Sequence, residues 1–250
     1  MAKKLRMVDR LLLGLAFIDE VLGDPIRLGN LAHQYGKLGF WVPRNYQGGP
    51  FKQLLYRMLK TGSIEKRVTN GEPELILTGS GRKLVERKFS MFKQQQKHWD
   101  GYWRLIIFDI PEKERNKRQR LRNKLLELGF GMWQKSIYLS PFDWEEDMVE
   151  FLQAEKFLGQ AWVLTAKHKL LGEAKDLAAS VWRLNQLNDE YESLSERLMG
   201  GREPLNKICY DYSVLLANDP CLPRELLPGG WAAFKVRQLI KDVTNKYPIG

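Results

Sequence analysis

PFKQLLYRMLKTGSIEKRVTNGEPELIL, residues 50–77, changes its hydrophobic period half-way and thereby decides the fold of the amino-terminal third. Before Gly62 the apolar residues recur at helical spacing, which predicts a helix opened by Pro50. After Gly62 the period is two, and Thr69-Asn-Gly-Glu72 is typical of a hairpin turn. The stretch therefore predicts a helix followed directly by two antiparallel strands.

The flanking residues predict three more helices. Residues 5–22 and 24–36 each carry an amphipathic pattern, and the second is opened by an Asp-Pro pair typical of a helix start. A closing helix is expected over residues 78–89. Three helices, a two-stranded wing and a closing helix, in this order, predict a winged helix-turn-helix domain over residues 1–98.

The positive charge is confined to this domain. Residues 1–98 hold 18 Lys and Arg against 8 Asp and Glu, whereas residues 99–250 hold 22 of each kind, so the net charge of +10 belongs to the first segment. Such a distribution is typical of nucleic-acid binding, because each neutralised phosphate releases counterions. A basic surface that only keeps the protein soluble is the alternative. Together with the winged helix, the charge predicts binding to double-stranded DNA.

The candidate DNA-contacting residues lie on the outer face of the third helix and in the hairpin. A glutamine can pair with adenine, and an arginine with guanine or with phosphate. Glu72 and Glu74 near the hairpin tip oppose insertion into an anionic groove, so we expect the hairpin to position the domain. A solvated helix face is the alternative. The candidates are Lys52, Gln53, Arg57 and Lys60 on the helix and Lys66 and Arg67 in the hairpin.

After a polar linker at residues 93–98, strands alternate with helices. An apolar run predicts a buried strand, and a basic amphipathic helix follows it up to Gly129. This βαββαβ-like alternation predicts a small ferredoxin-like domain over residues 99–170. The expected strands cover 103–110, 136–139 and 161–165, and the expected helices cover 112–128 and 144–157.

Residues 171–250 are expected to be helical, which gives the chain an α+β fold of three domains. Apolar residues at every seventh position predict one long helix with a seam that packs either within the chain or against a second copy. We expect this region to serve dimerisation or ligand binding. The seam comprises Leu177, Leu184, Tyr191 and Leu198, and later helices cover 205–216 and 231–243.

Three stretches carry a resemblance to a known family, and the central and carboxy-terminal ones are long enough to be specific. They are FKQLLYRML at 51–59 with the hairpin after it, WRLIIFDIPEKER at 103–115 with SIYLSP at 136–141, and DPCLPRELLP at 219–228. They resemble the PaaX family, the repressors of phenylacetic acid catabolism. The resemblance implies a homodimeric, DNA-binding transcriptional repressor that an acyl- or aryl-coenzyme A thioester releases from its operator.

The central domain is also similar to the metal-dependent nuclease of CRISPR spacer acquisition, which leaves a catalytic alternative. In that nuclease an aspartate at the end of the first strand holds a divalent ion, and Asp109 occupies the matching position. Capping of the next helix is the structural alternative for Asp109. The sequence has no Walker motif, nucleophile elbow, dinucleotide fingerprint or zinc ligand set. We therefore expect no cofactor, no bound metal and no enzymatic activity.

Seven basic residues, from Lys113 to Lys124, suggest contact with an anionic partner, either the DNA backbone or the phosphates of a coenzyme A thioester. Guanidinium groups can hold the phosphates of a coenzyme A thioester while aromatic residues take its apolar part. A solvated helix face is again the alternative. The candidates are Arg115, Arg118 and Arg122 for the phosphates, and Trp103, Trp133 and Trp162 for the apolar part.

The sequence carries no secretion or membrane signal. The first apolar run is followed directly by Asp19 and Glu20, and no run approaches the roughly 18 apolar residues of a membrane span. Cys209 and Cys221 lack the spacing of a metal or redox motif and are expected to stay reduced. We therefore expect a cytoplasmic protein.

Overall fold

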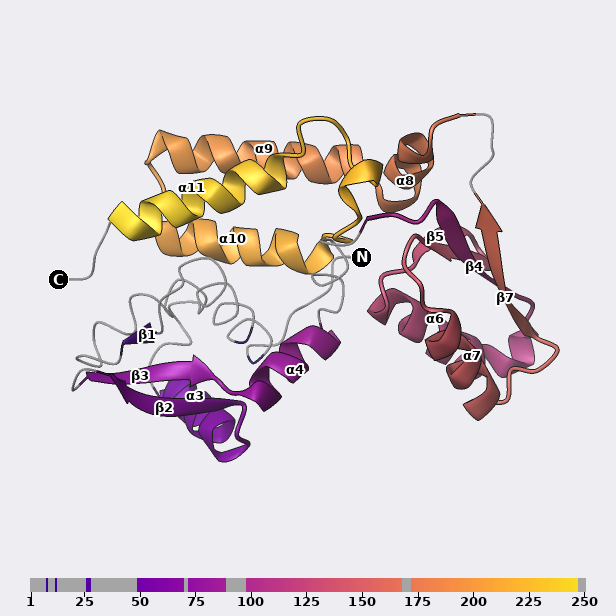
Figure 1. The fold of residues 1–250 in the computed structure, drawn as a ribbon, viewed down its shortest axis with the longest axis horizontal. Helices are drawn as coiled ribbons and strands as arrows, with labels where there is room; N and C mark the ends of the chain where they lie inside the picture. The colour runs from indigo at the N-terminus through magenta and orange to yellow at the C-terminus, as the bar shows by residue number, and fades with distance from the viewer. Residues whose placement is uncertain are drawn as a thin grey trace. The chain divides into compact units, whose positions relative to one another are not determined.

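The computed structural model describes residues 8, 12, 26–27, 49–69, 72–88, 98–167 and 172–246 (Figure 1). Packing divides the chain into two compact units. The first contains the described residues up to Lys88, together with 187–219 and 231–246, and the second contains those of 98–186 and 220–230. The domain boundaries 1–98, 99–170 and 171–250 stay a prediction.

The predicted helix and hairpin are confirmed. The helix ends in a Schellman motif, in which Gly62 adopts φ +68° while the Ser63 N–H donates to the Met58 carbonyl oxygen at 3.0 Å. The hairpin follows at once, and a closing helix comes after it. The elements are α3 (Gly49–Lys60), β2 (Ile64–Thr69), β3 (Glu72–Leu77) and α4 (Gly79–Lys88).

A short strand that the sequence did not reveal completes the sheet. β1 (Ile26–Arg27) pairs antiparallel with β3, and the strand order is β1-β3-β2. The second predicted helix, 24–36, is therefore wrong at these two residues, because their backbone groups bond to the free edge of β3. Its other residues lie outside the described part of the chain. Of the predicted helix 5–22, only Val8 and Leu12 are described, and both are helical.

One apolar cluster forms the core of this part of the first unit. α3 contributes its inward residues, the hairpin contributes one face, and Leu12 is fully buried against them. The start of α4 is attached to the turn after α3, because the Thr78 hydroxyl donates to the Gly62 carbonyl oxygen. The cluster comprises Leu12, Phe51, Leu54, Met58, Ile64, Leu75 and Leu77.

The second unit contains the predicted βαββαβ alternation. Its four strands form an antiparallel sheet in the order β5-β6-β4-β7, and residues from α6 and α7 share one apolar core with one face of the sheet. The short strand β5 is the one that the sequence analysis did not locate. The elements are β4 (Tyr102–Phe108), η3 (Glu112–Glu114), α6 (Arg115–Glu127), β5 (Gly131–Gln134), β6 (Ile137–Ser140), α7 (Glu145–Ala154) and β7 (Ala161–Lys167).

The other face of the sheet is covered at one end by α8 (Ala174–Trp182). The Trp182 ring stacks on Trp103 of β4 with centroids 6.3 Å apart, and its Nε1 donates to the Gly129 carbonyl oxygen at 3.3 Å. Gly131 makes this approach possible, because a Cβ there would lie 2.2 Å from Val181 Cγ1.

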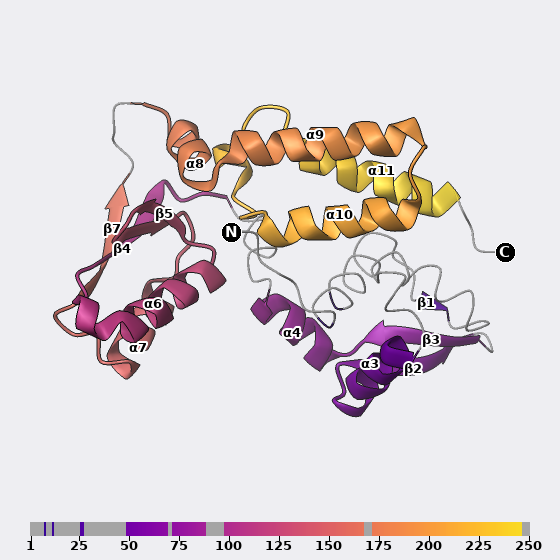
Figure 2. The same cartoon turned by 180° about the vertical axis from the view of Figure 1, so that it is seen from behind.

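The prediction of one long helix after residue 171 is wrong. α8 ends at Trp182, and Arg183 adopts a left-handed φ of +54° before α9 (Leu184–Gly200) begins. Tyr191 of α9 packs on Tyr212 of α10 and on Trp231, with ring centroids 6.4 and 5.8 Å apart. Figure 2 shows α9 alongside α10 (Leu205–Asn218) and α11 (Ala232–Lys246). Within the described residues, Tyr191 of the seam therefore packs inside the chain.

Candidate nucleic-acid interface

α3 has two sharply different faces. Phe51, Leu54 and Met58 are at most 3% exposed, because their helical spacing turns them toward the core. The opposite face carries side chains that are all exposed, and no acidic residue occurs anywhere in the helix. This face comprises Lys52, Gln53, Tyr56, Arg57 and Lys60.

The structure therefore brings four of the six predicted DNA-contacting residues together on one surface. They are Lys52, Gln53, Arg57 and Lys60, spaced over two turns. Three positive charges and one amide give this face donors for both phosphate oxygens and purine edges. We call the five exposed residues 52, 53, 56, 57 and 60 the outer face of α3.

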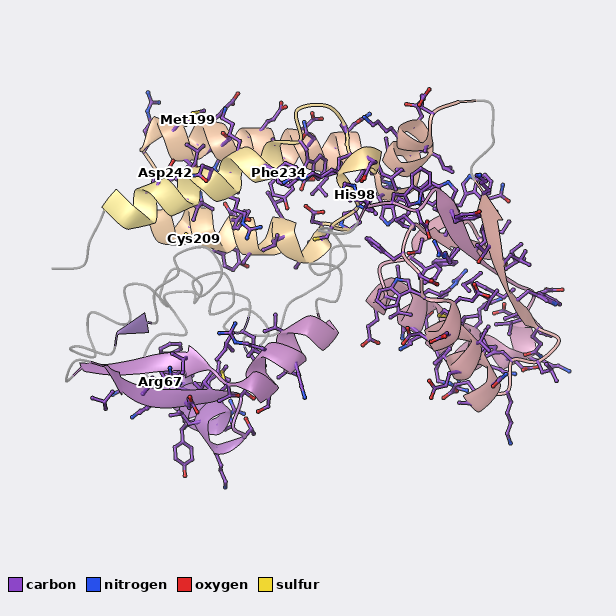
Figure 3. The ribbon with its side chains drawn as sticks, in the orientation of Figure 1. Arg67, His98, Met199, Cys209, Phe234 and Asp242 are labelled. Atoms are coloured by element: carbon purple, nitrogen blue, oxygen red, sulfur yellow. The ribbon has the colours of Figure 1, made fainter. Side chains whose placement is uncertain are left out.

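The other two predicted residues lie on β2. Lys66 and Arg67 are exposed, and Arg67 is the residue of the hairpin labelled in Figure 3. Arg67 Nη2 lies 3.8 Å from Glu65 Oε1, and the backbone register sets it opposite Glu74. Because acidic residues accompany Arg67, the hairpin offers less net positive charge than the outer face of α3.

The basic residues of α6 are mostly engaged within their own unit. Arg118 donates to Glu112 Oε2 and holds the pKa of that carboxyl below its usual range. Arg122 donates to the Lys135 carbonyl oxygen at 3.2 Å, while Arg115 is exposed. Ligand binding by these three arginines stays a prediction.

The three tryptophans proposed for a ligand lie in different environments. Trp103 is 4% exposed and packs between Trp99 and Trp182, whereas Trp133 and Trp162 are 43% and 47% exposed. Trp133 lies on β5 and Trp162 on β7, the two edge strands of the sheet. Three strand spacings separate these edges, roughly 14 Å. The sheet therefore does not bring Trp133 and Trp162 together in one small pocket.

Asp109 lies exposed directly after β4, and its backbone N–H donates to the Gln160 carbonyl oxygen at 2.9 Å. The capping interpretation is wrong, because the N-cap residues of η3 and α6 are Pro111 and Glu114. Among the described residues, no group of three or more His, Cys, Asp or Glu could hold a metal ion.

Two further sequence expectations concern the cysteines and membrane-spanning segments. Cys209 and Cys221 are both buried, and burial raises the pKa of the Cys209 thiol to about 12. No helix in the described part of the chain is long and apolar enough to cross a membrane.

Comparison with known proteins adds three findings. Residues 96–178 match the family model described as the PaaX protein central Cas2-like domain. The chain is 27% identical over 246 residues to the transcriptional repressor PaaX of Escherichia coli (strain K12), covering 90% of this chain and 75% of the relative. The solved structure of the uncharacterized protein Rv0674 from Mycobacterium tuberculosis shares the fold, with a TM-score of 0.59, 18% identity and 96% of each chain covered. By these matches, residues 96–178 are similar to the central domain of the PaaX family, and the chain as a whole is similar to a PaaX repressor.

Proposed function

We propose that this protein is a DNA-binding transcriptional repressor whose amino-terminal segment, residues 1–98, is a winged helix-turn-helix. The observation that carries the proposal is the outer face of α3, which is exposed, basic and free of acidic residues. The name of the Escherichia coli relative, a transcriptional repressor, supports the same function. A repressor works where the chromosome lies, so we also propose a cytoplasmic location.

The local architecture is compatible with groove binding. A helix is about 10–12 Å across with its side chains, and the major groove of B-DNA is about 12 Å wide. α3 packs on a sheet in the order β1-β3-β2 and leaves only its outer face for the groove. Lys52, Arg57 and Lys60 would hold phosphates or guanine, and Gln53 would pair with adenine. Lys66 and Arg67 would contact the backbone and set the orientation of the domain.

A second copy of the chain would cover the uncovered part of the central sheet. Ile106 and Phe108 of β4 belong to the core shared with α6 and α7, so the alternating residues Leu105 and Ile107 face the other side. Residues opposite them on neighbouring strands share that face. We call the incompletely buried part of this side the outer face of the sheet; it comprises Leu105, Ile107, Ile137, Trp162 and Leu164, whereas Leu139 is 1% exposed. Trp162 and Leu164 are each 47% exposed, and burial of this apolar surface would favour a C2 dimer.

An effector of the acyl- or aryl-coenzyme A class would have to bind anionic groups on basic residues of the second unit. Arg115 is exposed and would bind a phosphate directly. Arg118 and Arg122 would have to exchange their present partners for phosphate oxygens. Intrinsic tryptophan fluorescence and DNA affinity, measured while acyl-coenzyme A compounds are added, test this part. If neither signal responds to any compound, the effector proposal fails.

Selection from a library of random-sequence duplexes tests the main proposal. The wild-type protein should enrich one sequence, as an inverted repeat if it binds as a dimer. The enriched duplex should be retarded but intact after incubation with Mg²⁺. Cleavage that Asp109→Ala abolishes would instead establish the nuclease alternative, and binding without any sequence preference would contradict a repressor.

A further inference from the structure

The centre of the outer face of α3 is an aromatic ring. Tyr56 is 66% exposed and is not part of the core cluster to which the inner face of the helix belongs. Lys52 and Lys60 lie one turn before and one turn after it. Every other residue of this face is a charged residue or an amide, so Tyr56 differs from its neighbours in chemistry while it shares their exposure.

We propose that Tyr56 reads a thymine in the operator, through contact of its ring with the thymine C5-methyl group in the major groove. The inference rests on the proposed function, because it requires α3 to enter the groove. It assigns a sequence-reading role to a residue that the charge pattern did not select.

The chemistry of the groove favours this partner. The thymine methyl is the apolar group that base edges present in the major groove, and the other edge groups are hydrogen-bond donors and acceptors. The ring of Tyr56 gains little from folding, since most of it stays in water, but it gains when it is buried against an apolar group. The neighbouring lysines and arginine attract phosphates of any sequence. Tyr56 therefore contributes to selectivity and contributes nothing to the dependence of binding on salt.

The test removes the Tyr56 side chain and individual thymine methyl groups, separately and together. In the duplex that the wild-type protein selects, each thymine is replaced in turn by deoxyuridine, which removes the methyl group alone. The dissociation constant of each duplex is measured for wild type and for Tyr56→Ala. At one thymine position the replacement should weaken wild-type binding about fourfold, the effect of about one buried methyl group. The same replacement should leave the binding of Tyr56→Ala unchanged.

Tyr102→Ala is the matched control, because Tyr102 is a partly exposed tyrosine of the second unit at 38% exposure. It should respond to the replacements as wild type does, and both variants should keep the wild-type melting temperature. The slope of affinity against salt should be the same for Tyr56→Ala and wild type. If no thymine responds, or if Tyr56→Ala responds as strongly as wild type, the inference is overturned while DNA binding stands. If wild type selects no sequence, the proposed function itself fails.

Discussion

The Tyr191 hydroxyl donates a hydrogen bond to Asp219 Oδ2 at 3.0 Å, and the two residues are 0% and 2% exposed. The bond links α9 to the end of α10, where Asp219 is the C-cap residue. Tyr191→Phe should lower the free energy of unfolding by about 1–3 kcal/mol, because this buried hydrogen bond to Asp219 is lost while the ring packing remains. Chemical denaturation measures the change, with the more exposed Tyr102→Phe as control. Equal losses in the two variants would contradict the role of the bond.

Gly81 leaves no room for a side chain, since a Cβ there would lie 1.9 Å from the Ser63 carbonyl oxygen. Gly79, two residues earlier on the same helix, has nothing within 4 Å of such an atom. Gly81→Ala should therefore destabilise the first unit by about 1–3 kcal/mol, because backbone must move. Gly79→Ala should be neutral or slightly stabilising. Melting curves compare the two, and similar midpoints would show that the turn after α3 accommodates a methyl group.

Local signals predicted most of the described elements. α3 and α6 each end two residues before a glycine of positive φ, Gly62 and Gly129, as these glycines indicated. β1 was missed because its hydrogen bonds go to β3, nearly fifty residues away, and two residues carry no periodicity. The break at Arg183 was missed because the heptad spacing continues across it while the backbone does not.

At the candidate interface, too, local features were predictable from the sequence and contacts between distant residues were not. The exposure of Lys52, Gln53, Arg57 and Lys60 follows from helical spacing alone, so the sequence was sufficient. The partners of Arg118 and Arg122 were not visible in the sequence, since one acceptor is a backbone oxygen thirteen residues away. Tyr56 shares the exposed face of α3 with these residues but was not among the predicted contacts, because those followed charge and hydrogen-bonding capacity.

The positive charges of α3 should determine how DNA binding depends on salt. The triple variant Lys52→Ala, Arg57→Ala, Lys60→Ala should bind every duplex more weakly and reduce the slope of log affinity against log salt by up to about 0.9 for each lost phosphate contact. The double variant Lys113→Ala, Arg115→Ala removes two exposed charges of the second unit and serves as control. A larger reduction in the control would place the main DNA contact at η3 and the start of α6.

Arg197 joins two acidic side chains around the α9–α10 connection. Its Nε and Nη2 donate to Glu203 at 2.8 and 2.7 Å, and Nη2 also donates to Asp211 at 2.5 Å. The hydrogen bond from Arg197 lowers the pKa of Glu203 from 4.5 to about 2. A carboxyl group with a lowered pKa stabilises the fold above its unfolded pKa and loses this contribution as the pH falls toward the folded value.

Stability should therefore decrease between about pH 4.5 and pH 2, and Arg197→Met should make this decrease shallower. Denaturation midpoints measured across this range test the expectation, with the exposed Arg202→Met as control. If Arg197→Met keeps the wild-type pH profile, the cluster does not contribute to acid sensitivity.

Leu164 should control dimerisation, because it lies on the outer face of the sheet beside Trp162 and is 47% exposed in the single chain. Leu164→Glu would place a carboxylate in the proposed interface, where burial without a partner is costly. The variant should sediment as a monomer at micromolar concentration and keep the wild-type melting behaviour of its separate units. Its affinity for the selected inverted repeat should fall, since two linked half-site contacts become independent. Leu158→Glu is the matched control, because Leu158 is 96% exposed in the loop before β7 and lies off this face. A wild-type protein that sediments only as a monomer, or equal behaviour of the two variants, would show that a second copy does not use this face.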